Sequence, residues 1–130
     1  MKLFLSSESN MKSLNKEFQR EFSFLRLALY DDPHKPKQSS IIGHKVSDHT
    51  PLKHISDLVP AYILIEPSDT VNEVEQKFQN RYGLPVQIFR KSGDTWVETA
   101  QTDNLTLEKQ NDMGAASVYK PNFNINTLFL

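Results

Sequence analysis

Residues 61–83 read AYILIEPSDTVNEVEQKFQNRYG, and this stretch decides the fold. Ala61–Ile65 is a short apolar run of the kind that forms a β-strand. Thr70 and Glu73 have the spacing of a capping box, and Gly83 stands where a helix commonly ends. The apolar residues at helical spacing between them are Val71, Val74, Phe78 and Tyr82. The stretch therefore predicts a strand, a turn and an amphipathic helix.

The same pattern begins sixty residues earlier in the chain. Leu3-Phe4-Leu5 aligns with Ile63-Leu64-Ile65, Met11 with Val71, Leu14 with Val74, Phe18 with Phe78, and Phe22 with Tyr82. A second strand is predicted after each helix. It covers Leu25, Leu27 and Leu29 in the first copy, and residues 86–91 in the second, where Ser92-Gly93-Asp94 turns into a further strand at 95–99. The alignment indicates two βαβ repeats, about residues 2–30 and 61–99.

The two repeats predict an α+β fold in which duplicated βαβ units form a ferredoxin-like sandwich, with one sheet, both helices on one face and an added hairpin strand. A ubiquitin-like β-grasp is the alternative. Residues 1–118 are expected to form one domain, with an irregular joining segment at 31–60 and a C-terminal tail at 119–130. Within these limits we expect a weak strand at 37–47 and short helices at 51–58 and 105–111.

Composition excludes several classes of protein. Fifteen basic and sixteen acidic side chains leave a net charge of −1, which argues against a strong general nucleic-acid binder. The absence of cysteine excludes disulfides, thiolate metal sites and a cysteine nucleophile. No apolar run has the length of a membrane-spanning helix or of a signal peptide, so a cytoplasmic protein without membrane contact is expected.

Two resemblances lie in the second half of the chain. Residues 66–85, with Glu66-Pro67-Ser68-Asp69-Thr70-Val71 and Gly83-Leu84-Pro85, resemble the strand-to-helix segment of ubiquitin. The chain ends Asn126-Thr127-Leu128-Phe129-Leu130 without the di-glycine of ubiquitin, so a conjugation function does not follow. The run Val86–Gly93, followed by Trp96, Glu98-Thr99, Thr102-Asp103, Thr106-Leu107 and Gln110-Asn111, is similar to the signature of a family of small bacterial proteins. That resemblance implies a shared fold and no mechanism.

The polar residues favour neither a metal site nor catalysis. His44, His49 and His54 follow at intervals of five, whereas metal-binding pairs favour three or four, and His34 stands alone. The chain has no G-x-S-x-G motif, and four glycines do not build a phosphate-binding loop. We therefore expect no cofactor, no metal and no catalytic residues. A small enzyme that uses the central histidines is the least favoured alternative.

The predicted sheet carries large apolar residues on both faces. If one face packs under the helices, alternation places Phe4, Tyr62, Leu64, Phe89 and Trp96 on the other. A face bare to solvent should be polar. We therefore expect a cover: the tail, the middle segment, a second subunit or a ligand.

These five residues, with Arg90, are the predicted interaction surface. The function favoured is a non-enzymatic protein-interaction module, with a homodimer as one form. The alternative is a single-stranded nucleic-acid-binding protein, because Arg90 and Lys91 stand near Trp96. A solvated hairpin whose cations protect an edge strand explains the same residues.

Overall fold

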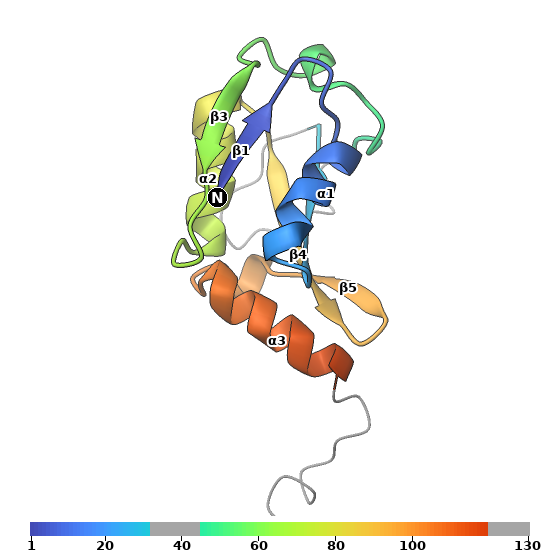
Figure 1. Cartoon of the computed structure of the whole chain (residues 1–130), viewed down its shortest axis with the longest axis vertical. Coiled ribbons are helices and arrows are strands. Elements are labelled where there is room, and N and C mark those ends of the chain that lie inside the picture. The colour runs from blue at the N-terminus through green and yellow to red at the C-terminus, as the bar shows by residue number, and fades with distance from the viewer. Residues whose placement is uncertain (32–44, 120–130) are drawn as a thin grey trace, which may run out of the picture.

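The computed structural model describes residues 1–31 and 45–119 of the 130-residue chain (Figure 1). The elements follow the order that the sequence predicts, a strand, a helix and a strand, twice. The five strands are β1 (Lys2–Leu5), β2 (Leu25–Leu29), β3 (Ala61–Leu64), β4 (Val86–Ser92) and β5 (Thr95–Glu98). The helices are α1 (Met11–Glu21), α2 (Val71–Tyr82) and α3 (Leu107–Tyr119), and two short 3-10 helices are η2 (Leu52–His54) and η3 (Ala100–Thr102).

The described strands form two antiparallel sheets. One contains β1 and β3, and the other has the order β2-β4-β5. The fold is α+β, as predicted, and is compatible with a ferredoxin-like or a β-grasp arrangement. The expectation of one continuous sheet is wrong, because each strand pairs with the strand at the same position of the other βαβ unit: β1 with β3 and β2 with β4.

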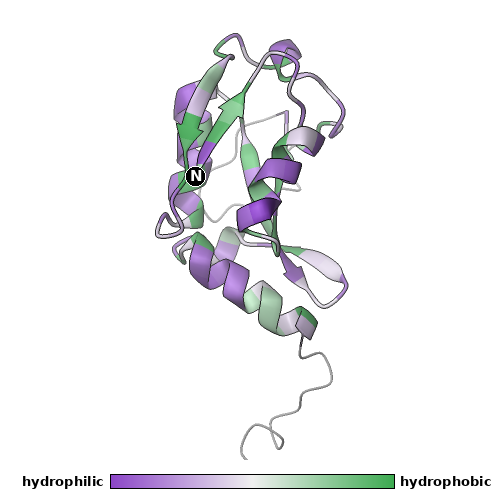
Figure 2. Cartoon of the chain, viewed as in Figure 1, coloured by the Kyte–Doolittle hydropathy of each residue, from purple (hydrophilic) through white to green (hydrophobic). Residues whose placement is uncertain are grey.

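Each of the three α-helices packs against two strands. α1 packs against β1 and β2, α2 packs against β3 and β4, and α3 packs against β4 and β2 at the other end of the molecule from η2 (Figure 1). Hydrophobic colouring follows β1, β3 and β4, and hydrophilic colouring covers much of α1 (Figure 2). Phe18 of α1 and Phe78 of α2 are both fully buried in the hydrophobic core. Burial of such aromatic side chains is worth about 1.5–3 kcal/mol each.

Matching hydrogen bonds recur about sixty residues apart. Asn10 and Thr70 each cap a helix in a capping box, with Ser13 and Glu73 as the reciprocal partners. The preceding turns also correspond, because Ser9 Oγ accepts from Ser6 N at 3.0 Å and Asp69 Oδ2 accepts from Glu66 N at 2.9 Å. In the β1–β3 register, Leu3 lies opposite Ile63. In the β2–β4 register, Leu27 lies opposite Ile88, and this offset has grown to sixty-one because α2 is one residue longer than α1.

A further correspondence lies outside the predicted repeats. Lys12 N donates to Asp48 O at 3.0 Å, and Asn72 N donates to Asp103 O at 2.8 Å. Four residues after each aspartate is a fully buried leucine, Leu52 or Leu107. Their N–H groups bond to the carbonyls of Ser9 and Asp69, at 2.8 and 2.9 Å. This pair was not predicted from the sequence, although the shared spacing from aspartate to leucine was a readable signal.

Some element bounds differ from the prediction. The helix expected at 51–58 is the single turn η2, and the helix expected at 105–111 starts at Leu107 but continues to Tyr119. Of the strand expected at 37–47, only 45–47 is described, and Lys45 forms an isolated bridge with Tyr30. Residues 32–44 and the tail after Tyr119 lie outside the described residues, so the expectations for them are not tested.

Candidate interaction surface

The β1–β3 sheet has an apolar outer face. Leu3, Leu5 and Ile63 point into the core, so alternation sends their neighbours to the solvent side. Phe4, Tyr62 and Leu64 lie there with 47%, 55% and 52% of their surface exposed, and we call these three residues the outer patch. Its rings contact each other, with the centroids of Phe4 and Tyr62 4.8 Å apart. Lys2 Nζ lies 5.5 Å from the centre of the Tyr62 ring. About half of the surface of each of these three residues is therefore open to solvent among the described residues.

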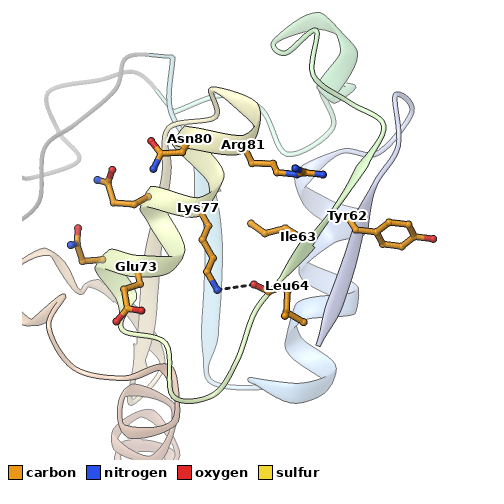
Figure 3. Close-up of a pocket in the computed structure, with 9 residues that line it drawn as sticks. Tyr62, Ile63, Leu64, Glu73, Lys77, Asn80 and Arg81 are labelled. Atoms are coloured by element: carbon orange, nitrogen blue, oxygen red, sulfur yellow. Dashed lines mark hydrogen bonds between the residues drawn. The ribbon is translucent and has the colours of Figure 1, made fainter.

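A groove of about 920 Å³ adjoins the outer patch, between β3 and α2 (Figure 3). β3 contributes Tyr62, Ile63 and Leu64, and α2 contributes the polar side chains of Asn72, Glu73, Gln76, Lys77, Asn80 and Arg81. In Figure 3, Glu73 lies toward the Leu64 end of the strand and Arg81 lies toward the Tyr62 end. This groove was not predicted from the sequence, because it forms only where the edge of β3 and the polar side of α2 lie side by side.

Lys77 joins the two walls of the groove. Its Nζ donates to Leu64 O at 2.9 Å and to Asp69 Oδ2 at 2.6 Å. Burial alone would raise the pKa of Asp69, but the bonds from the Glu66 N–H and from Lys77, together with the lysine charge, hold that pKa below its usual value. Asp69 is therefore an anion in the folded protein at neutral pH, and it fixes Lys77 against the end of β3.

Phe89 and Trp96 lie on the other sheet, away from the outer patch. They line a hollow of about 200 Å³ with Arg26, Ala28, Tyr30 and Lys45. Trp96 is half-buried, and Lys91 Nζ lies 5.0 Å from the centre of its ring. The expectation that Phe4, Tyr62, Leu64, Phe89 and Trp96 share one face is therefore wrong, because β4 pairs with β2 and β5 rather than with the β1–β3 pair.

Arg90 lies on yet another side. It alternates with Phe89 along β4, so its side chain points to the opposite face, where it donates to Gln110 Oε1 at 2.9 Å on α3. Its Nη1 also lies 3.8 Å from the sulfur of Met113. These contacts are those of a residue that holds α3 against the sheet.

The cations near Trp96 are partly neutralised. Arg26 and Lys45 both form ion pairs with Asp48, at 2.9 and 3.0 Å. Burial opposes the charge on Asp48, but the two cations lower its pKa below the usual value. This hollow therefore presents less free positive charge than its residue types suggest.

The histidines are not brought together where the structure describes them. His49 is exposed on the loop before η2 and His54 is exposed at the end of η2, whereas His34 and His44 lie outside the described residues. Within 1–31 and 45–119, no three histidine, aspartate or glutamate side chains gather in a way that could hold a metal ion.

Comparison with known proteins adds no relative: no family model, no curated protein and no solved structure matches the chain. Among the helices of the described residues, none is both long and apolar enough to cross a membrane.

Proposed function

We propose that the protein is a non-enzymatic protein-interaction module and that the outer patch is its binding surface. The observation that carries the proposal is the exposure of Phe4, Tyr62 and Leu64 side by side on one sheet face. Single exposed apolar residues are common, but adjacent large ones are typical of interaction sites. Aromatic residues are also enriched at the centres of protein interfaces.

Two further features support a binding role for this face. The rings of Phe4 and Tyr62 already pack against each other across the paired strands, with centroids 4.8 Å apart, which reduces the side-chain freedom that binding would cost. Glu73, Lys77 and Arg81 border the patch through the groove and supply the polar rim that interfaces usually have.

Site-specific photocrosslinking tests the proposal. A photoreactive phenylalanine analogue replaces Leu64 in cells that make the protein, and the matched control carries it at Lys16, which is exposed on α1. We expect a defined adduct from position 64 that is absent from position 16 and is lost when Phe4→Ser is added. Equal products from both positions, or none from position 64, would contradict the proposal.

The same proposal includes an internal repeat. The paired caps, turns and buried leucines of the two halves support a duplication of one βαβ unit together with the aspartate-to-leucine segment that follows it. Under this interpretation, Phe4 and Leu64 are equivalent residues, and the outer patch lies where the two copies meet.

A second candidate function is single-stranded nucleic-acid binding on the β2-β4-β5 sheet. The contact of Lys91 with Trp96 favours it, because bases stack on aromatic rings beside cations. Titration of Trp96 fluorescence with short oligonucleotides at several salt concentrations tests it. A quench that weakens steeply with salt would support this function, and no change at low salt would exclude it.

A further inference from the structure

The outer edges of the β2–β4 pair are occupied by bonds to other parts of the chain. On β2, Asn15 bonds both backbone groups of Leu27 at 2.8 Å, and Gln19 donates to the Leu25 carbonyl at 2.9 Å. On β4, Glu75 accepts from Ile88 N at 2.9 Å, and β5 pairs with the residues beyond. These contacts occupy the edge of β2 at Leu25 and Leu27 and the edge of β4 at Ile88, and β5 is the edge strand of this sheet.

The outer edge of β3 is different. Met1 and Ile65 exchange two backbone bonds, so alternation along the ladder makes Leu3–Ile63 a bonded pair and Phe4–Tyr62 an unbonded one. The N–H and C=O groups of Tyr62 and Leu64 therefore point away from β1, toward the groove. Within the described residues no strand lies there, and the one bond to this edge is from Lys77 to Leu64 O.

We propose that β3 pairs antiparallel with β3 of a second copy of this chain. The inference rests on the proposed function, because it names the partner for the surface formed by the outer patch and its groove. The two-fold axis passes beside Ile63, so Tyr62 lies opposite Leu64 of the other copy. Each such pair exchanges two hydrogen bonds, which gives four across the interface. The Leu64 carbonyl keeps its bond to Lys77, since a carbonyl oxygen has two lone pairs.

Self-pairing also suits the side chains on the sheet. It places the Tyr62 ring against Leu64 of the other copy on the outer face, a cross-strand contact of the kind that stabilises sheets. It converts two two-stranded sheets into one sheet of four strands. A two-stranded sheet is marginal by itself, and three or more strands are much more stable.

The charged residues of α2 that border the groove favour a second copy of this chain as the partner that binds there. Glu73 and Arg81 border the same groove at opposite ends, beside Leu64 and Tyr62 respectively (Figure 3). The axis that pairs Tyr62 with Leu64 of the other copy also brings Glu73 toward Arg81 of that copy, twice. Lys77 lies nearest the axis, but its charge is already paired with Asp69 at 2.6 Å. The groove is therefore electrostatically complementary to itself.

Sedimentation of the full chain over a range of concentrations tests the proposal. Tyr62→Pro removes the N–H that points into the groove and leaves the bonds to β1 intact. The matched control is Lys2→Pro, which removes an N–H on the outer edge of β1, because Lys2 lies opposite Leu64 in an unbonded pair. We expect wild type to dimerise, Tyr62→Pro to raise the dimer dissociation constant at least about tenfold, and Lys2→Pro to leave it unchanged. A wild type that stays monomeric at all concentrations overturns the proposal, as does a dimer weakened by Lys2→Pro instead.

The charged pair has its own test. Glu73→Gln keeps a side chain that can complete the capping box, and Arg81→Gln removes the opposite charge. Each is expected to raise the dimer dissociation constant about two- to fivefold at low salt. A dissociation constant that neither substitution changes would overturn the Glu73–Arg81 contact.

Hydrogen exchange measured on the wild-type protein tests the proposal without relying on the folding of any variant. The amides of Tyr62 and Leu64 should become protected as concentration rises, whereas the amide of Phe4 on the opposite edge should not. Unchanged exchange at Tyr62 and Leu64 would overturn the proposal. A monomeric chain that still gives the Leu64 photoadduct with a different protein would refute this inference while leaving the proposed function in place.

Discussion

The side chain of Asn15 forms two hydrogen bonds with the backbone of Leu27, donating to its carbonyl and accepting from its N–H, each at 2.8 Å. Sixty residues later along the chain, Glu75 accepts from the N–H of Ile88, the residue that lies opposite Leu27. Each helix thus supplies one buried polar side chain to the outer edge of one strand. The bonds give these buried backbone groups partners and prevent another strand from pairing at Leu27 and Ile88.

Asn15→Ala should lower the free energy of unfolding by about 2–4 kcal/mol. The substitution leaves a buried N–H and a buried carbonyl of Leu27 without partners, and each such loss costs about 1–3 kcal/mol. Urea denaturation measures the change. The control is Lys16→Ala, an exposed neighbour on α1 that should change stability by less than about 0.5 kcal/mol. Equal effects of the two substitutions would contradict the role of Asn15.

Phe18→Ala and Phe78→Ala should each cost about 3–5 kcal/mol. Both rings are fully buried, so each truncation loses transfer free energy and leaves a cavity. Chemical denaturation of both variants, with exposed Asn80→Ala as the control, measures the cost. A loss below about 1 kcal/mol for either ring would show that the core repacks around it.

Gly114→Ala should destabilise the protein, although alanine favours helices. A Cβ at this position would lie 2.7 Å from Phe24 Cβ and 3.1 Å from Phe24 O, where α3 crosses the start of β2. The gain in helix propensity of about 1 kcal/mol is smaller than the cost of overpacking, so we expect a net loss of about 1–2 kcal/mol. Thermal unfolding measures it. A stabilised variant would mean that α3 moves away from Phe24 at little cost.

Asp69→Asn should reduce the dependence of stability on acid pH. The pKa of Asp69 is lower in the folded protein than in the unfolded chain, so ionisation stabilises the fold above the unfolded pKa of about 3.9. This contribution is lost as pH falls from about 5 through the folded pKa. Because Lys77 is partly exposed, we expect about 1 kcal/mol at neutral pH. Urea unfolding between pH 2 and pH 7 should show a shallower decline in the variant. Asp94→Asn, in an exposed turn, is the control.

Local signals predicted most elements, because caps and periodicity act within a few residues. The capping box of Thr70 and Glu73 forms as expected, and Gly83 ends α2 with a positive φ of 66°. The alternation of β1 and β3 also correctly placed Phe4, Tyr62 and Leu64 on the side away from the core. The buried stripe of α2 was readable for the same reason.

The sequence by itself therefore determined the order of the five strands and of α1 and α2, the cap of α2, and the apolar residues that α1 and α2 bury. Only the tertiary structure decided which strands pair, and with that which surfaces form. Phe89 and Trp96 lie apart from Phe4 and Tyr62 because β4 pairs with β2. That pairing joins residues about sixty positions apart in the chain. Periodicity within one strand carries no information about its neighbour. The free edge of β3 and its groove with α2 exist only once β1 has paired with β3 and β2 with β4.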